Sequence, residues 1–391
     1  MKLVFTFGTR PEAIKLAPLV HEAQRRRGVH PVVVCTGQHR ELLRPVLELF
    51  SLRPDHHLEL MTGGQSLGGF TGRAVEGLAD LFGRLRPDAV AVQGDTTTVL
   101  CGALAAFYNR IPVAHVEAGL RTDSRYSPFP EEMNRRLAAQ LATWHLAPTA
   151  KAKEALVAEG VRRLGGHIHI TGNTGIDALF LGLELAKGAP PPAGELGEVF
   201  ARLDSDPSRP LVLVTGHRRE SFGEPLERVC RALRRVAGAH PELLFVYPVH
   251  LNPNVKGPVQ EMLGGLGNVF LTPPAGYGDF LRLMKRSHLI VTDSGGVQEE
   301  GPALGKPVLV TRETTERPEA VEAGGVRLVG LDEDRIVGEL ERLVAGGEEY
   351  RRMAVPRFPY GDGQAAARCL DAILGEPVEQ FRPDGGPEPA P

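Results

Sequence analysis

The sequence predicts an α/β protein of two domains, each built on a doubly wound parallel sheet. Short apolar runs rich in Val, Ile and Leu alternate with helical patterns over residues 1–172. A Pro- and Gly-rich stretch follows at residues 188–194, and the alternation restarts at residue 211. Such alternation is typical of parallel sheets. The chain of 391 residues is long enough for two hydrophobic cores.

The elements of the first domain follow from apolar periodicity and from turn residues. Proline at the first turn of the helix at residues 11–27 favours a helix start there. Strands are predicted at residues 3–7, 31–36, 89–93, 112–116, 144–147 and 169–171. The further helices are predicted at residues 40–49, 66–85, 96–109, 131–142 and 150–158.

The second domain is predicted to cover residues 173–361. A helix at residues 173–187 leads to a short helix between linker-like residues 188–194 and 204–210. Strands are then predicted at residues 211–215, 243–248, 269–272, 289–292, 308–311 and 326–329, and helices at 297–304, 332–344 and 364–374. The Pro- and Gly-rich residues 377–391 are expected to be disordered.

Polar side chains follow several predicted strands, where the sites of parallel sheets lie. Arg10 and Lys15 come after the first strand and could bind phosphate, although they also fit a solvated helix start. Asp95 and Glu117 end strands that one helix separates, so the two strands should be neighbours. The two carboxylates could then share one edge of the sheet, and two such domains imply a cleft between them.

Glu131 and Arg135 open the next helix at positions i and i+4, where they could form a surface ion pair. In the second domain His217 and His250 also follow strands. Neither histidine lies in a spacing that is diagnostic of a site.

The stretch from residue 289 to 310 predicts an anion site. Ser294 is a suitable N-cap after an apolar strand, and Gly295 and Gly296 would let a ligand approach the backbone. A helix N-terminus offers free N–H groups and the positive end of the helix dipole. Glu299 and Glu300 could accept hydrogen bonds from sugar hydroxyls. An ordinary strand-to-helix turn would use the same residues.

Composition and motifs exclude several classes. A net charge of -3 does not indicate a nucleic-acid surface. Residues 204–206 and 332–334 match the D-x-D spacing of some metal-dependent transferases, but both lie in a loop or at a helix start, where acidic residues serve as caps. No G-x-G-x-x-G motif occurs, so neither a metal nor a dinucleotide is expected. No signal-peptide pattern and no membrane-span-length apolar run is present. Four scattered cysteines fit reduced thiols in the cytoplasm (Cys35, Cys101, Cys230 and Cys369).

These motifs together resemble the non-hydrolysing UDP-N-acetylglucosamine 2-epimerases, which have the GT-B fold. The resemblance covers nearly the whole chain except the tail. It is carried by FGTRPEAIKLAP, GQHRELL, VQGDTTTV, HVEAGLRT, PFPEEMNR, TGNTGIDAL, VTGHRRESFG, PVHLNPNV, VTDSGGVQEEGPALGKPVLV and TERPEA. It implies two Rossmann-like domains and a last helix, about residues 362–376, that returns to the first domain.

The resemblance also implies roles for residues at matching positions. The acid/base groups around the sugar would be Asp95, Glu117, Glu131 and His217. The substrate-binding residues would be Arg10, Lys15, Arg135, Ala275, Phe280, Ser294, Gly295, Gly296, Glu300 and Arg317, with the diphosphate on Arg10, His217 and residues 294–296. Glu300 would hold the ribose, and uracil would sit against Phe280 and Ala275. No redox cofactor and no catalytic metal are expected.

Some relatives bind a second UDP-N-acetylglucosamine as an activator. The matching residues are Gln38, Glu41, Gly64, Gln65, Glu131, Arg218 and His250. Glu41 stands where the activated pattern has Gln, and Gly64 stands where it has Arg. Loss of a cation and gain of an anion predict weak or absent activation. A homodimer is expected from the resemblance alone.

The implied reaction is the reversible conversion of UDP-GlcNAc to UDP-ManNAc in the cytoplasm. UDP would leave C1 while C2 loses its proton, and UDP would add back to the 2-acetamidoglucal. A hydrolysing epimerase, a GT-B glycosyltransferase and a non-catalytic sugar-nucleotide regulator remain alternatives. The resemblance leaves open whether the product serves a surface polysaccharide or a wall polymer.

Overall fold

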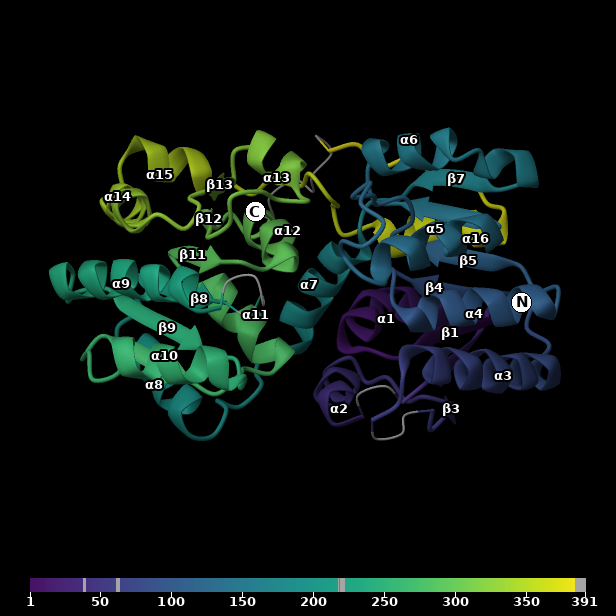
Figure 1. Ribbon diagram of the computed structural model, residues 1–391, viewed down its shortest axis with the longest axis horizontal. Coiled ribbons are helices and arrows are strands. Elements are labelled where there is room, and N and C mark those ends of the chain that lie inside the picture. Colours follow the sequence, from purple (N-terminus) through teal and green to yellow (C-terminus); the bar gives the residue numbers. More distant parts are fainter. Residues whose placement is uncertain (38–39, 61–63, 217, 219–221, 384–391) are drawn as a thin grey trace. The chain divides into compact units, whose positions relative to one another are not determined.

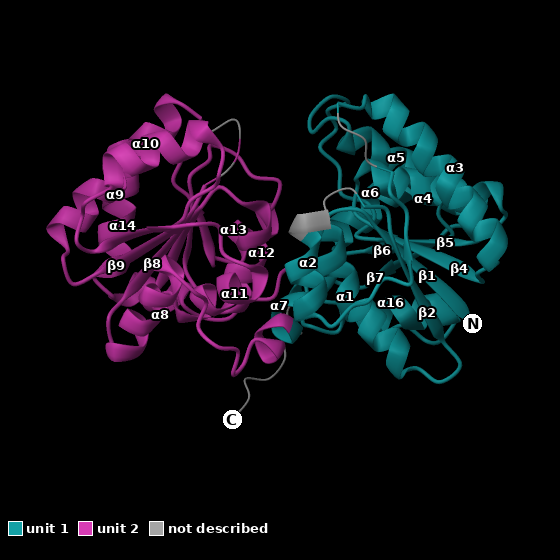
Figure 2. Cartoon of the chain, turned by 90° about the horizontal axis from the view of Figure 1, so that it is seen from below, with its two compact units in different colours: residues 1–181, 360–391 teal, residues 182–359 magenta. Residues whose placement is uncertain are grey.

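The chain forms two α/β units, each with its own parallel sheet (Figures 1 and 2). Unit 1 contains Met1–Leu181 and Tyr360–Pro391, and unit 2 contains Gly182–Pro359. The computed structural model describes residues 1–37, 40–60, 64–216, 218 and 222–383; for residues 40–42 it describes the helix but not the side chains.

The sheet of unit 1 has seven strands in the order β3-β2-β1-β4-β5-β6-β7, and its neighbouring strands pair in parallel. The order reverses between β1 and β4, which is the point where open α/β sheets bind ligands. The strands are β1 (Lys2–Phe7), β2 (His30–Cys35), β3 (His56–His57), β4 (Ala89–Gln93), β5 (Val113–Val116), β6 (Trp144–Ala147) and β7 (His167–Ile170).

Three helices of unit 1 begin at residues whose side chains cap them. Ser66, Thr96 and Thr149 each accept a backbone N–H of the helix that follows. The helices are α1 (Arg10–Arg25), α2 (Arg40–Leu49), α3 (Leu67–Leu85), α4 (Thr97–Tyr108), α5 (Glu131–Leu141), α6 (Ala150–Ala158) and α16 (Ala365–Leu374), with a 3₁₀ turn at Val161–Leu164. α7 (Thr174–Leu185) contains the boundary between the units.

The sheet of unit 2 has six strands in the order β10-β9-β8-β11-β12-β13, again with parallel pairing. Its order reverses between β8 and β11. The strands are β8 (Leu211–Thr215), β9 (Leu244–Pro248), β10 (Val269–Thr272), β11 (Leu289–Thr292), β12 (Val308–Val310) and β13 (Val326–Leu328).

The helices of unit 2 are α8 (Glu195–Ser205), α9 (Glu224–Ala239), α10 (Pro253–Leu263), α11 (Tyr277–Arg286), α12 (Gly295–Ala303), α13 (Pro318–Glu322), α14 (Glu333–Val344) and α15 (Glu348–Met353). Residues of α9, α10, α14 and α15 join the strands in a large cluster of buried apolar residues that includes Phe245, Tyr247 and Leu340. In the described part of the chain no helix combines the length and apolarity needed to cross a bilayer.

The two parallel-sheet domains predicted from the sequence are therefore confirmed. The unit boundary lies within α7, whereas the sequence placed it before this helix, because no linker composition marks a division inside a continuous helix.

The prediction that residues 377–391 are disordered is wrong for residues 377–383. Phe381 is buried, and its N–H donates to Ile170 O at 2.7 Å. Gln380 Oε1 accepts the N–H of Ile170, so this segment is bonded to β7. The Pro- and Gly-rich composition did not indicate that Gln380 and Phe381 attach this segment to β7. Residues 384–391 lie outside the described part.

Candidate active site

The carboxyl ends of β1 and β4 carry Arg10 and Asp95, on either side of the point where the strand order of unit 1 reverses. Arg10 is the first residue of α1 and is exposed, so its guanidinium can reach a ligand. Asp95 follows β4 directly after Gly94, which has φ +82°. The loops after β1 and β4 therefore lie at the carboxyl edge of the sheet, where the sequence predicted site residues.

Glu117 directly follows β5, which pairs with β4 as the sequence predicted. Its side chain forms an ion pair with Lys15 Nζ on α1 and accepts a 2.9 Å hydrogen bond from Gln93 Nε2. Its φ of +63° is uncommon for a residue other than glycine, and such conformations concentrate at functional sites. A Cβ at Gly119 would lie 2.2 Å from Ala152 O, so only glycine fits the turn that follows.

Asp95 is held by residues of α5. Its carboxylate forms an ion pair with Arg135, and its carbonyl accepts a 3.0 Å hydrogen bond from Asn134 Nδ2. Among the described residues, Arg135 pairs with Asp95 and with Glu132 at 3.5 Å rather than with Glu131. The surface pair suggested by the i and i+4 spacing is thus wrong, because Arg135 is buried and points to the strand end.

Glu131 is the first residue of α5 and is partly buried, so its carboxylate remains accessible. Its neighbour Glu132 is fully buried and accepts hydrogen bonds from Thr122 and Arg136. The two adjacent carboxylates therefore have different roles, since Glu132 fixes the loop before the helix and Glu131 is available to a ligand.

His115 lies behind the carboxylates on β5. Its Nε2 is 2.7 Å from Gly94 O, and because a carbonyl accepts, Nε2 carries the proton. Burial lowers the pKa of His115 to about 4, so the ring is neutral near pH 7. His115 thus supports the loop that carries Asp95, a role that its strand position did not reveal.

In unit 2 the N-terminus of α12 follows β11, beside the point where the strand order reverses. Ser294 is the N-cap residue, as predicted, and its N–H donates to Thr292 Oγ1 at 3.0 Å, while its hydroxyl forms no capping bond. A Cβ at Gly296 would meet no atom within 4 Å, so the backbone of the first turn is open to a ligand.

Two arginines and a carboxylate lie beside this helix start. Arg218 NH2 and Arg312 NH1 each donate to Glu316 at 2.7 Å. Burial would raise the pKa of Glu316, but the two guanidinium groups outweigh it and lower the pKa to about 2. Arg218 also donates its backbone N–H to Asp293 Oδ2 at 2.9 Å. This cluster was not predicted, because Arg218 and Glu316 lie 98 positions apart in the sequence.

The two glutamates of α12 have different partners. Glu300 accepts a 3.2 Å hydrogen bond from the Tyr277 hydroxyl and is partly exposed, which suits a group that binds hydroxyls. Glu299 is buried and forms an ion pair with Arg317. Arg317 is thereby anchored to α12. Ala275 and Phe280 lie at the start of α11 and are partly buried.

Several predicted residues lie outside what the structure describes. These are His217 and Gln38, together with the side chain of Glu41. Of the remaining residues of the expected second-ligand site, Gln65 accepts a hydrogen bond from Arg73, and His250 is exposed and accepts the N–H of Asn252.

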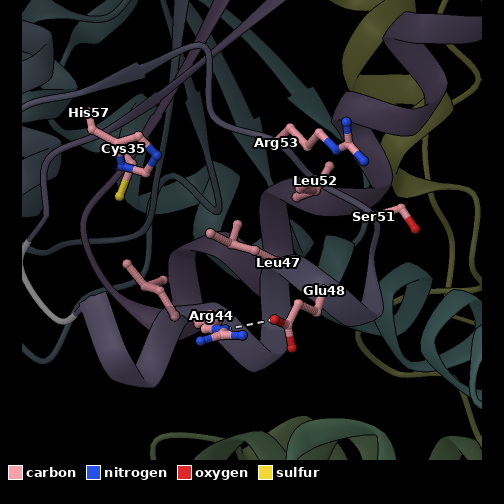
Figure 3. Close-up of a pocket in the computed structure, with 9 residues that line it drawn as sticks. Cys35, Arg44, Leu47, Glu48, Ser51, Leu52, Arg53 and His57 are labelled. Atoms are coloured by element: carbon pink, nitrogen blue, oxygen red, sulfur yellow. Dashed lines mark hydrogen bonds and ion pairs between the residues drawn. The ribbon is translucent and has the colours of Figure 1, made fainter.

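A pocket in unit 1 lies against α2 and is separate from these residues (Figure 3). Leu43, Leu47 and Leu52 form its apolar part, and Arg44 pairs with Glu48 at its rim. None of the nine residues that line it was predicted as a site residue.

The described residues can perform two kinds of chemistry. Unit 1 presents Asp95, Glu117 and Glu131, carboxylates able to take up or release protons, together with the cation Arg10. Unit 2 presents a helix N-terminus that suits an anionic group. A reaction that transfers a proton and releases an anionic group needs both kinds of group.

Comparisons with known proteins agree with this chemistry. The model of the UDP-N-acetylglucosamine 2-epimerase family matches residues 21–374. The UDP-N-acetylglucosamine 2-epimerase of Escherichia coli K12 is 51% identical over 373 residues, which cover 95% of this chain and 98% of the relative. That of Yersinia pestis is 49% identical over 378 residues, 97% of this chain and 100% of the relative. The crystal structure of UDP-GlcNAc 2-epimerase from Neisseria meningitidis bound to UDP-GlcNAc has a TM-score of 0.85 and 43% identity, covering 96% of this chain and 100% of that chain.

Proposed function

This chain belongs to the UDP-N-acetylglucosamine 2-epimerase family, and we propose that it interconverts UDP-GlcNAc and UDP-ManNAc without releasing the sugar. The observation that carries the proposal is the pair Asp95 and Glu117. These carboxylates follow neighbouring strands, and each is paired with a buried or half-buried cation. A transferase that only exchanges a leaving group for an acceptor does not need two such proton-transfer groups.

The nucleotide is assigned to unit 2. The first turn of α12 offers N–H groups of residues 295 and 296 to the diphosphate. Glu300 would accept hydrogen bonds from ribose hydroxyls, and Phe280 would contact uracil. Arg10 in unit 1 and His217 would neutralise the charge that the diphosphate gains as it leaves. Lys15 and Arg317, each in an ion pair, would order the carboxylates around the ligand.

The sugar chemistry is assigned to Asp95, Glu117 and Glu131. One carboxylate takes the proton from C2 while the bond from C1 to the phosphate oxygen breaks. The electron pair of the C–H bond forms the double bond of a 2-acetamidoglucal, and UDP leaves with the electron pair of the C1–O bond. A second protonated group then delivers a proton to the opposite face of C2, and UDP re-forms its bond to C1.

The reaction exchanges a proton and a leaving group, so its electron balance needs no redox partner. We therefore propose that no nicotinamide cofactor takes part, and that Arg10 and the N-terminus of α12 bind the diphosphate in place of a catalytic metal. A cytoplasmic location is proposed because the four cysteines are buried and none of them forms a disulfide, as expected of reduced thiols. A homodimer is proposed from the family alone.

The decisive experiment is incubation of the purified protein with UDP-GlcNAc in D2O, followed by NMR. The expected result is a mixture of UDP-GlcNAc and UDP-ManNAc that carries deuterium at C2, with UDP still attached. Free N-acetylmannosamine and UDP as the only products would identify a hydrolysing enzyme. Absence of deuterium from C2 would exclude epimerisation by proton transfer.

A further inference from the structure

Glu12 is a buried carboxylate that connects two loops at the carboxyl edge of the sheet in unit 1. It lies on the first turn of α1 and is 1% exposed. Its Oε2 accepts the backbone N–H groups of Gly8 at 3.1 Å and Thr9 at 2.7 Å. Its Oε1 accepts the hydroxyl of Thr96 at 2.7 Å, although 84 residues separate the two. Glu12 therefore joins the loop after β1 to the loop after β4.

Each of these loops carries a residue of the proposed site. Arg10 directly follows Thr9, and Asp95 directly precedes Thr96. The donors to Glu12 are therefore close neighbours of site residues: Gly8 and Thr9 directly precede Arg10, and Thr96 directly follows Asp95. The positions of the phosphate-binding cation and of the acid/base group are coupled through a single side chain.

The hydrogen bonds of Thr96 show which form of Glu12 the structure favours. Thr96 Oγ1 already accepts the N–H of Val99 at 3.3 Å as the N-cap of α4. Its proton is then directed to Glu12 Oε1, while Oε2 accepts the two backbone N–H groups. Both oxygens therefore act as acceptors, as in a carboxylate, and the N-terminus of α1 favours the negative charge.

Burial alone would favour the neutral acid. It raises the pKa of Glu12, and the hydrogen bonds from Thr9, Thr96 and Gly8 oppose that rise. The charge therefore depends on the two loops staying in place around it. A buried carboxylate that loses a donor is costly, which makes the junction sensitive to small displacements of either loop.

We propose that Glu12 is a positioning residue of the reaction, which holds Asp95 in register with Arg10 through its bond to Thr96. The inference rests on the proposed epimerisation. It predicts that the Glu12–Thr96 bond matters for proton transfer at C2 and not for binding of the nucleotide. A purely structural role would lower the melting temperature but leave turnover intact.

The test compares Thr96→Val with Thr96→Ser in the full-length protein. Valine keeps the shape of the side chain and removes the bond, whereas serine keeps the hydroxyl. Thr96→Val should lower kcat for deuterium exchange at C2 by about 10–100-fold, because a small displacement of a reacting group has effects of this size. Its dissociation constant for UDP should stay within about threefold of the wild-type value. Thr96→Ser should restore most of the turnover.

Thr149→Val is the matched control. Thr149 caps α6 by accepting the N–H of Ala152 at 3.3 Å, as Thr96 caps α4, but does not bond to Glu12. It should lose comparable thermal stability and keep its kcat. The same Thr96→Val change made in a Glu12→Met protein should lower kcat by less than about threefold, because methionine has a similar length but cannot accept the hydrogen bond from Thr96.

The outcomes separate the two levels of the proposal. Deuterium missing from C2 with the wild-type protein overturns the proposed function, and this inference with it. Deuterium present in the wild type, with kcat of Thr96→Val within about threefold of it, overturns the positioning role alone. The positioning role is also overturned if Thr96→Val lowers kcat equally in the wild-type protein and in the protein that lacks the Glu12 carboxylate. Should Glu12→Met fail to fold, the comparison of Thr96→Val, Thr96→Ser and Thr149→Val decides by itself.

Discussion

Lys15 and Glu117 form an ion pair although 102 residues separate them in the sequence. The pair brings the second turn of α1 against the end of β5. Gln93 donates to the same oxygen of Glu117, so the carboxylate is oriented from two sides. A side chain fixed in this way can transfer a proton without first reorganising its surroundings.

Glu117→Gln is expected to abolish most turnover while nucleotide binding survives. The amide cannot take up a proton, so kcat should fall by about 10²–10⁴-fold. Affinity for UDP should change little, because Glu117 is not among the proposed diphosphate contacts. Deuterium exchange and calorimetry measure the two quantities. Glu22→Gln, which removes a surface carboxylate paired with Arg26, is the control and should keep its activity. Equal loss of UDP affinity would mean that Glu117 only shapes the site.

Asp95→Asn should likewise lower kcat by at least about 10²-fold with near-normal UDP affinity. The ion pair with Arg135 is lost as well, so a modest drop in melting temperature is expected. Asp371→Asn is a matched control, because Asp371 also pairs with an arginine in unit 1, Arg26 at 2.7 Å. That variant should lose some stability and no turnover. Normal kinetics of Asp95→Asn would remove Asp95 from the proposed mechanism.

Gly296→Ala should weaken UDP binding without harming the fold. The added methyl group would meet no protein atom within 4 Å, but it would stand where a phosphate approaches the first turn of α12. A loss of about tenfold in affinity, or about 1.4 kcal/mol, is expected by calorimetry. Gly238→Ala on α9 also has open space and should leave affinity unchanged. Unchanged binding by Gly296→Ala would place the diphosphate elsewhere.

Stability should fall as the pH drops from about 6.5 to about 4, because two buried histidines resist protonation. His115 and His145 are register partners on β5 and β6. Burial lowers the pKa of His115 to about 4 and that of His145 to about 3. The unfolded chain therefore binds protons that the folded chain does not. The stabilisation that the two neutral histidines provide is fully present above the pKa of histidine in the unfolded chain, about 6.5, and it decreases as the pH falls below that value.

His145→Leu should reduce by one the number of protons that the unfolded chain binds in excess of the folded chain. The slope of the free energy of unfolding against pH should decrease by about 1.4 kcal/mol per pH unit in that range. Urea unfolding at several pH values between about 4 and 7 measures the slope. A slope equal to that of the wild type would show that His145 does not contribute.

The rate is expected to depend hyperbolically on the concentration of UDP-GlcNAc. Gly64 and Glu41 replace an arginine and a glutamine of the activated pattern, which weakens contacts to a second phosphorylated ligand. Initial rates over a wide substrate range provide the test, with Arg234→Ala as a control on a distant helix. A sigmoidal curve that Arg218→Ala converts to a hyperbola would contradict the prediction.

Sequence patterns predicted most of the fold because strand and helix periodicities are local. Strands β4, β6, β8, β10 and β11 were predicted with the residues that the structure shows. β3 was missed because two histidines carry no apolar pattern. α9, α10 and α11 were left unassigned, although each has an apolar face.

The site was predictable where a residue ends a strand and not where it depends on a distant partner. Asp95 and Glu117 stand at strand ends, and parallel pairing brings them together. The bond of Glu12 to Thr96 and the pairing of Arg135 with Asp95 join residues 84 and 40 positions apart. The T-x-x-E spacing of Thr9 and Glu12 does indicate a capping box, but that motif explains only the bond within the loop.

The return of the chain to unit 1 after unit 2 has a consequence for synthesis. α16 packs against α1, and Asp371 and Glu376 pair with Arg26. The first 181 residues leave the ribosome long before these partners exist. During that interval the face of α1 that later contacts α16 is exposed to solvent or covered by a chaperone. Unit 1 reaches its final form only after unit 2 has been translated.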